Sequence, residues 1–165
     1  MLDWSIEQKD YPVAIKVPGG KLISDGKTNL KDFSRLNTYE ITERGSNVAI
    51  IGLGGFYHLG KEVAILLKES TGINATIVNP YYITGLDENT LNGLKENHKV
   101  VITLEDGFLD GGFGQKIAGF YGNTDMKVLN YGIKTEFLDR YNLEEVLKDN
   151  HLTPKQIVED IKEVL

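Results

Sequence analysis

Four short apolar runs recur along the second part of this chain, and polar, glycine-containing segments separate them. Each run is rich in β-branched and aliphatic residues, which is typical of a strand that is buried on both faces of a parallel sheet. A fifth segment, residues 39–43, alternates polar and apolar positions and is a candidate edge strand. The four apolar runs are residues 47–53, 73–78, 100–104 and 126–130.

The segments between and after these runs carry apolar residues three and four positions apart, which is helical spacing. Gly72 lies where the first helix needs a C-terminal cap, and Asp87 precedes the second as an N-cap. Thr153 and Gln156 form a capping box with Pro154 at the first helical position. The predicted helices cover residues 59–70, 87–97, 115–121 and 143–148, followed by an amphipathic final helix after Thr153.

Strands that alternate with helices of this length indicate a mostly parallel sheet covered on both faces. The sequence therefore predicts an α/β domain over residues 38–165. We expect three layers, α/β/α, around a five-stranded, mainly parallel sheet.

The first 37 residues predict a different organisation. Residues 2–8 have the pattern of the last turns of a helix, and residues 13–17 that of a short strand ended by Pro18 and two glycines. The polar stretch that follows, up to about residue 38, is typical of a linker. A helix that begins at Met1 without a cap is what a piece of a longer chain would contain, and this segment has too few apolar residues for its own core.

Composition excludes several classes of protein. The chain has 165 residues, a net charge of −6 and no cysteine, so disulfides and thiolate metal sites are excluded. Lysines scattered among acids argue against a nucleic-acid partner, which usually needs a clustered basic face. No apolar run approaches the ~20 residues that span a bilayer, and the start lacks a signal-peptide pattern, so we expect a cytoplasmic protein with no membrane partner.

Gly52-Leu-Gly-Gly55 lies between a predicted strand and a helix, as the dinucleotide-binding turn does. Tyr57 occupies the third glycine position, and the next strand ends in Asn79-Pro80, where a ribose-binding acid would stand. A tight strand-to-helix turn is therefore the favoured interpretation. Phe56, Tyr57 and His58 would then lie at the carboxyl edge of the sheet, where an aromatic cluster could contact another domain or subunit.

The segment from Leu104 to Gly114 combines two acids, Glu105 and Asp106, with four glycines. It follows a predicted strand, and the carboxyl edge of a parallel sheet is where α/β proteins place their sites. The acids could be an acid/base pair or metal ligands, could accept backbone N–H bonds within the glycine loop, or could face a partner subunit. His98, at the other end of the strand, is about 17 Å away and cannot serve this loop.

The sequence of this segment is a strand ending in Leu-Glu-Asp, followed by Gly-Gly-x-Gly. It resembles the corresponding segment in the C-terminal domain of the 1-deoxy-D-xylulose-5-phosphate synthase family, which belongs to the transketolase superfamily. Further similar segments cover nearly the whole chain. Pro12-Val-Ala-Ile-Lys-Val-Pro18 resembles the end of the preceding pyrimidine-binding domain. The resemblance therefore implies that residues 1–37 are the remnant of that domain with its linker, and that residues 38–165 are a transketolase-like C-terminal domain. The other similar segments are Asn74-Ala-Thr-Ile-Val-Asn-Pro80, Gly85-Leu-Asp-Glu88, Val128-Leu-Asn-Tyr-Gly132 and Leu152-Thr-Pro-Lys-Gln-Ile157.

The resemblance also implies a function for the parent protein. Members of the family use thiamine diphosphate and Mg²⁺ to decarboxylate pyruvate and join the two-carbon unit to glyceraldehyde 3-phosphate, and they form homodimers. This chain lacks a diphosphate-binding domain with its Gly-Asp-Gly motif, so we expect it to bind no cofactor or metal and to be inactive alone. In the family an arginine-containing turn near residues 16–20 helps to hold the substrate phosphate. Here Lys16 is the remaining candidate, since Gly19 stands at the second arginine position.

In this superfamily the C-terminal domain helps to form the dimer and carries little of the cofactor chemistry. We therefore expect no catalytic residue in this chain and assign interface roles to residues of the two carboxyl-edge segments. Two alternatives stay open, namely another transketolase-type enzyme and a free-standing interaction module. The interface candidates are Phe56, Tyr57, His58, Glu105, Asp106, Phe108, Leu109 and Asp110.

Overall fold

The computed structural model describes residues 1–17, 32–136 and 139–165, which form two units, Met1–Leu36 and Asn37–Leu165. The N-terminal unit contains helix α1 (Leu2–Glu7), which agrees with the predicted helix and buries no residue. The strand predicted over residues 13–17 is wrong, because this segment has no regular structure. Val17 is 69% exposed, and the described part of this unit offers no strand with which the segment could pair.

The larger unit alternates strands and helices as the hydrophobic pattern predicts. Its N-terminal part comprises β1 (Tyr39–Glu43), β2 (Asn47–Gly52), α2 (Phe56–Thr71), β3 (Thr76–Pro80) and α3 (Glu88–Leu94). Its C-terminal part comprises β4 (His98–Phe108), α4 (Phe113–Tyr121), β5 (Lys127–Ile133), α5 (Leu143–Asp149) and α6 (Pro154–Val164). No helix in the described ranges has both the length and the apolar character needed to cross a membrane.

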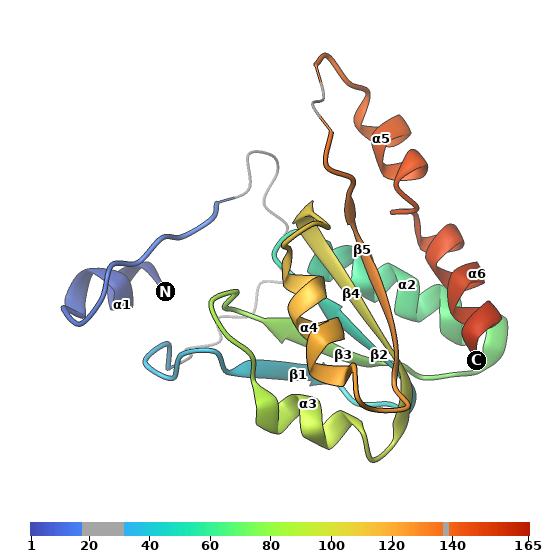
Figure 1. Cartoon of the computed structure of the whole chain (residues 1–165), viewed down its shortest axis with the longest axis horizontal. Coiled ribbons are helices and arrows are strands. Elements are labelled where there is room, and N and C mark those ends of the chain that lie inside the picture. The colour runs from blue at the N-terminus through green and yellow to red at the C-terminus, as the bar shows by residue number, and fades with distance from the viewer. Residues whose placement is uncertain (18–31, 137–138) are drawn as a thin grey trace. The chain divides into compact units, whose positions relative to one another are not determined.

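The five strands form one sheet in the order β1-β3-β2-β4-β5 (Figure 1). All neighbouring strands are parallel except β1, which is antiparallel to β3 at the edge. The predicted five-stranded, mainly parallel sheet with residues 39–43 at an edge is therefore confirmed. β2 lies at the centre, so the chain moves from β2 to β3 on one side and then crosses back to β4 on the other.

Two apolar cores, one on each face of the sheet, confirm the predicted three layers. On one face, α2 and α6 pack against side chains such as Val48, Ile50 and Ile102. On the other face, α3 and α4 pack against Ala49, Ile51 and the neighbouring strands. Alternate residues of β2 thus enter opposite cores, which explains why this strand is apolar almost throughout.

Local signals located several helix ends correctly. Gly72 ends α2 in the left-handed conformation at φ 78° and donates its N–H to the Lys68 carbonyl. The Asp87 carboxylate accepts a hydrogen bond from the Thr90 N–H and so caps α3. Thr153 Oγ1 accepts from the Gln156 N–H at 3.4 Å at the start of α6, with Pro154 as its first residue.

Several elements are longer than the sequence predicts, and two of these extensions shape the carboxyl edge of the sheet. The helix expected over residues 59–70 begins at Phe56, directly after its N-cap Gly55. The strand expected over residues 100–104 extends from His98 to Phe108, because Phe108 pairs with Ile133 of β5 after an irregularity in the ladder. Glu105 and Asp106 are therefore strand residues rather than loop residues.

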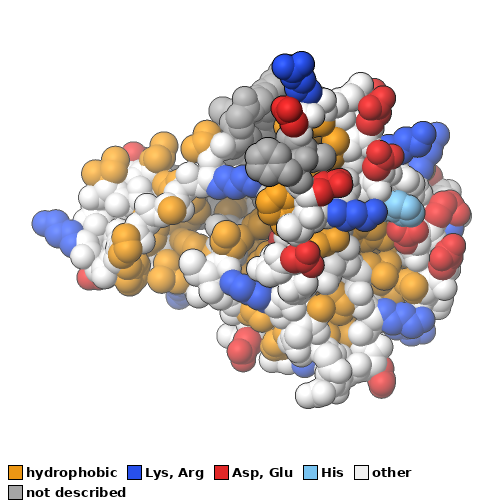
Figure 2. Space-filling view, turned by 45° about the horizontal axis from the view of Figure 1, so that its top comes forward, with side chains coloured by type: hydrophobic (Ala, Val, Ile, Leu, Met, Phe, Trp, Pro, Cys, Tyr) orange, Lys and Arg blue, Asp and Glu red, His pale blue; other side chains and the backbone are white. Residues whose placement is uncertain are grey.

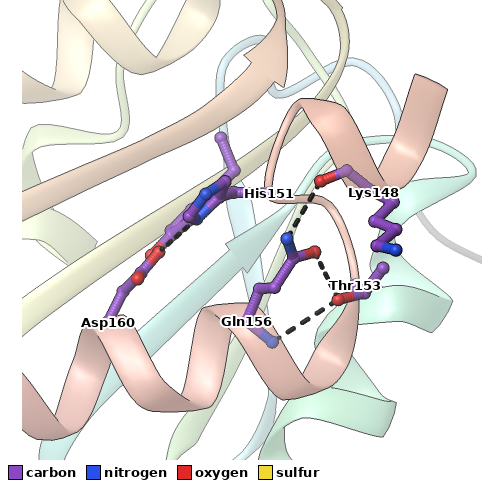
Figure 3. A network of polar contacts seen from close by, with 6 residues as sticks. Lys148, His151, Thr153, Gln156 and Asp160 are labelled. Carbon is purple, nitrogen blue, oxygen red and sulfur yellow. Dashed lines mark hydrogen bonds and ion pairs between the residues drawn. The ribbon is translucent and has the colours of Figure 1, made fainter. Parts of the chain in front are cut away.

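Helix α6 is tied to the sheet and to the preceding turn by polar contacts. The buried Tyr131 of β5 donates its hydroxyl to the Asp160 carboxylate at 3.0 Å. His151 Nδ1 lies 3.4 Å from the same carboxylate, and Gln156 Nε2 donates to the Lys148 carbonyl (Figure 3). The Tyr131–Asp160 bond connects α6 to β5, the other two contacts connect α6 to the preceding segment, and the apolar stripe of α6 supplies the buried surface.

His98 opens β4 and connects three elements. Its Nδ1 lies 2.9 Å from the Leu94 carbonyl, which can only accept, so Nδ1 carries the proton. Nε2 is then the acceptor for the Thr76 hydroxyl at 2.8 Å, and Thr76 Oγ1 in turn accepts the Gly45 N–H at 2.9 Å. Burial lowers the pKa of His98, although the bond to Leu94 opposes the shift.

We expect this histidine to make folding pH-dependent. The unfolded chain binds its proton near pH 6.5, whereas the folded chain binds it only at lower pH, so stability is full above about pH 6.5 and falls as pH decreases through the lower, folded pKa. Urea unfolding measured between about pH 7.5 and pH 5.5 should show this loss. His98→Gln should flatten the profile, because the glutamine side chain does not titrate. A profile that keeps its slope without His98 would contradict the assignment.

Candidate functional site

The carboxyl ends of β2 and β4 lie side by side. Here the order of strands reverses, because β3 is added on one side of β2 and β4 on the other. The two strands are parallel neighbours, with Gly52 paired to Leu104, and the Leu53 N–H donates to the Leu104 carbonyl at 2.8 Å. The helix after β2 covers one face and the helix after β4 covers the other. Such a switch point is where doubly wound sheets place their sites. The two predicted segments therefore emerge side by side at this edge.

Glu105 is the central residue of this edge, and it lies inside the domain. Only 4% of the residue is exposed, and its carboxylate accepts the N–H groups of Phe113 and Gly114 at 2.8 and 3.0 Å. These are the first residues of α4, whose N-cap Gly112 has no side chain to offer. The negative charge of Glu105 is favourable at the positive end of the helix. Among the roles that the sequence left open, this geometry corresponds to a carboxylate that binds backbone N–H groups.

The glycines of this segment are required for close approach. A Cβ on Gly112 would lie 2.5 Å from Glu105 Oε2, and one on Gly132 of the adjacent strand would lie 3.0 Å from the Gly107 carbonyl. Gly114 packs against Thr103 and Asn130, where a Cβ would meet Thr103 Oγ1 at 2.5 Å. The glycines therefore allow a buried carboxylate, a helix start and a strand to share one small volume. The contact of Gly112 and Gly132 with Glu105 arises from packing between distant segments, which the glycine pattern of the sequence does not specify.

The remaining residues of the segment are held in place but present side chains outward. The Leu109 N–H donates to the Ile133 carbonyl at 3.0 Å, and Asp110 accepts the Thr135 hydroxyl at 2.9 Å. Phe108 is 51% exposed, Asp106 and Asp110 are exposed, and Leu109 is half-buried. The segment is thus an ordered ledge, defined here as residues 106–110, which exposes an aromatic ring between two carboxylates.

The aromatic cluster after β2 forms the first turn of α2, and all three of its residues are half-buried. Phe56 packs against the core beneath α2. Tyr57 donates its hydroxyl to Thr42 Oγ1 of β1 at 3.0 Å and contacts the His58 ring edge-on. The buried parts of these three side chains therefore pack within the domain, and their exposed parts belong to the surface of the carboxyl edge.

The remaining sequence candidates do not join this site. Lys16 lies in the N-terminal unit as an exposed residue of its irregular segment. Gly19, at the departure from the family pattern, lies outside the described residues. Within the described ranges no group of three or more His, Cys, Asp or Glu residues could hold a metal ion. Figure 2 shows charged side chains of both signs interleaved with exposed apolar ones on one face of the chain.

Comparison with known proteins places this arrangement in a family. The model of the family described as "Transketolase, C-terminal domain" matches residues 37–157, which is most of the chain. The chain belongs to the transketolase C-terminal domain family. The family fold, with its mixed five-stranded sheet, agrees with the α/β architecture described above.

Curated relatives of this transketolase C-terminal domain bear the name 1-deoxy-D-xylulose-5-phosphate synthase. The protein from Clostridium tetani is 28% identical over 100% of this chain and 26% of its own length, and that from Clostridium acetobutylicum is 36% identical over 90% of this chain and 24% of its own. The protein from Alkaliphilus oremlandii is 32% identical over 92% of this chain and 24% of its own length. The chain thus spans about a quarter of the length of these relatives. The family resemblance expected from the sequence is confirmed.

Solved structures share the fold of this transketolase C-terminal domain at low identity. The structure described as "Split gene transketolase, inactive beta4 tetramer" has a TM-score of 0.69 and 22% identity over 78% of this chain and 42% of its own. A transketolase from Pichia stipitis in complex with sedoheptulose 7-phosphate has a TM-score of 0.51 and 14% identity, over 77% of this chain and 17% of its own. These similarities describe the fold alone.

Glu105 should be among the most sensitive positions of the domain. We expect Glu105→Ala to destabilise the chain by about 2–4 kcal/mol, because two buried N–H groups lose their acceptor. Gly112→Ala should also destabilise it, since the added Cβ meets the carboxylate. Urea unfolding measures both, and Glu62→Ala on the exposed side of α2 is the control, expected within about 0.5 kcal/mol of the parent chain. Equal stabilities for the Glu105→Ala and Glu62→Ala chains would contradict the role of Glu105.

Proposed function

We propose that this chain is the C-terminal part of a thiamine-diphosphate-dependent 1-deoxy-D-xylulose-5-phosphate synthase. The observation that carries the proposal is the common name of curated relatives that match 90–100% of the chain, while the chain spans about a quarter of their length. In this proposal residues 1–37 are the end of the pyrimidine-binding domain with its linker, and residues 38–165 are the C-terminal domain. The protein acts in the cytoplasm.

The parent would join pyruvate and glyceraldehyde 3-phosphate. The bond between the carboxylate and the carbonyl carbon of pyruvate breaks and CO₂ leaves. The carbonyl carbon then bonds to the aldehyde carbon of glyceraldehyde 3-phosphate, whose oxygen takes up one proton and becomes a hydroxyl group. Thiamine diphosphate, with Mg²⁺, supplies the stabilisation of negative charge on the transferred carbon. The described residues of this chain do not fit that cofactor, because they hold no metal-binding cluster and Glu105 already occupies the start of α4. We therefore assign no step of the reaction to this chain.

The role proposed for this chain is assembly of the parent. Phe108 stands half exposed on a ledge whose backbone is fixed by Glu105 and by pairing with β5. Covering this ring with a partner would be favourable, because it removes apolar surface from water. We propose that the ledge, with the outer rims of Phe56, Tyr57 and His58, faces the rest of the parent chain or the second subunit of a homodimer. Lys16 is the proposed contact to the substrate phosphate.

Another transketolase-type enzyme is the second candidate, supported by the solved transketolase structures that share the fold. Those structures are at most 22% identical to this chain, whereas the synthase relatives reach 36%. The synthase is therefore the stronger proposal.

Two assays test the proposal that the full-length parent binds the cofactor and catalyses the reaction, whereas this chain alone does neither. Calorimetric titration of the isolated chain with thiamine diphosphate and Mg²⁺ should give no saturable heat. The full-length parent should bind the cofactor under the same conditions and convert pyruvate and glyceraldehyde 3-phosphate. Micromolar cofactor binding by the isolated chain would refute its assignment as a non-catalytic part. A parent that transfers two-carbon units between sugar phosphates but ignores pyruvate would favour the transketolase alternative.

The interface role of the ledge is tested in the full-length parent. We expect Phe108→Ser to shift the dimer towards monomer in analytical ultracentrifugation, with turnover falling in proportion to dissociation. Leu165→Ser is the control, because Leu165 is similarly exposed, at 45%, but follows α6 beside the start of β5, where Lys127 donates to the Val164 carbonyl. An intact dimer whose turnover collapses at unchanged cofactor affinity would assign the ledge to the chemistry instead.

A further inference from the structure

A groove of about 430 Å³ lies at the opposite, amino-terminal edge of the sheet. One wall is the turn between β1 and β2, residues 43–46, together with Asn74 and Ala75 before β3. The other wall is one stripe of α2, namely Lys61, Ala64, Ile65 and Lys68. These α2 positions follow the i, i+3, i+4, i+7 spacing of a single helix face.

The wall formed by the turn is rigid. Gly45 approaches the β3 side so closely that a Cβ would lie 1.9 Å from the Asn74 carbonyl oxygen. The Gly45 N–H donates to Thr76 Oγ1 at 2.9 Å, and the Ser46 N–H donates to the Asn74 carbonyl at 2.9 Å. Arg44 therefore extends from a fixed backbone, and the groove is formed before any ligand arrives, as small-molecule sites usually are.

The charge of the groove is opposite to that of the chain. Arg44, Lys61 and Lys68 line it with a single acid, Glu43, whereas the chain as a whole carries a net charge of −6. In the ranges that the structure describes, no carboxylate forms an ion pair with any of these three cations. Lys61 contacts the Tyr57 ring at 5.8 Å from its centroid. The cations remain available to an anion that enters between the two walls.

The lining also has an apolar part. Lys61 and Lys68 are two helical turns apart, about 10 Å along α2, and Ala64 and Ile65 lie between them. Ile65 is 59% exposed. The volume falls within the range of about 300–1,000 Å³ that is typical of small-molecule sites. A ligand that fits combines an anionic group with a compact apolar body.

We propose that this groove binds a small phosphorylated organic molecule. Its phosphate lies between the Arg44 guanidinium, which can bind two phosphate oxygens at once, and the ammonium groups of Lys61 and Lys68. Its apolar part rests on Ala64 and Ile65. The proposal does not depend on the proposed synthase function, because it uses only this chain's residues at an edge remote from the ledge.

Nuclear magnetic resonance titration of the ¹⁵N-labelled chain tests the site with three probes: phenyl phosphate, inorganic phosphate and phenol. Phenyl phosphate should cause saturable shifts in the amides of residues 43–46, 61–68 and 74–75. Inorganic phosphate should bind the same residues more weakly, and phenol should cause no saturable shift. The ionic strength is matched with NaCl throughout, because exposed charges are screened by salt.

A pair of charge-matched variants makes the test specific. Lys61→Gln with Lys68→Gln should weaken phenyl phosphate binding about tenfold or more, since a single charge-assisted hydrogen bond supplies at least that factor. Lys99→Gln with Lys155→Gln removes the same charge from exposed sites outside the groove and should leave the affinity unchanged. Equal weakening in both pairs, or shifts that NaCl alone reproduces, would overturn the proposal. So would saturable binding of a glutamate-rich peptide where phenyl phosphate fails, since the groove would then be a protein contact.

Discussion

The buried carboxylate of Glu105 is the contact on which the carboxyl edge of this domain depends. It lies at the last fully buried position of β4 and accepts the first two N–H groups of α4. A charge with 4% exposure is costly to bury unless hydrogen bonds satisfy it, and the helix start supplies them. Without that acceptor, α4 would have no side-chain cap, because Gly112 has none to give. One residue therefore connects the end of the strand to the start of the helix that follows it.

The topology of the sheet separates two surfaces with different chemistry. At the carboxyl edge, β2 and β4 end side by side, and the ledge presents Phe108 between Asp106 and Asp110. At the amino edge, the β1–β2 turn and α2 enclose a groove lined by three cations. Helix α2 contributes to both surfaces, since its first turn carries Phe56 to His58 and its middle carries Lys61 to Lys68. The proposed assembly surface and the proposed ligand site therefore share no residue, although Lys61 of the groove lies over the ring of Tyr57.

Much of the fold was predictable because local physics decides it. Apolar runs gave the strands, Gly72, Asp87 and Thr153 marked helix ends, and the alternation of elements gave the layers. The features that the sequence did not predict depend on contacts between residues that are far apart in the chain. β4 continues to Phe108 because Ile133, 25 positions later by residue number, pairs with it, and no local pattern encodes that partner. Residues 13–17 have strand-like composition, but the described part of their unit contains no strand with which they could pair. Arg44 and Lys68 line one groove although they lie 24 positions apart in the sequence, and only the packing of α2 on the sheet brings them together.

Native-state hydrogen exchange of the Phe113 and Gly114 amides tests most directly whether the carboxyl edge is a rigid surface held by Glu105. These protons are bonded to a buried carboxylate, so they should exchange only when the whole domain unfolds. Their opening free energies should then equal those of the core amides of Val101 and Ile102 in β4. Exchange as fast as that of surface turns would contradict the account, because the ledge would then be a mobile loop and Glu105 a passive neighbour.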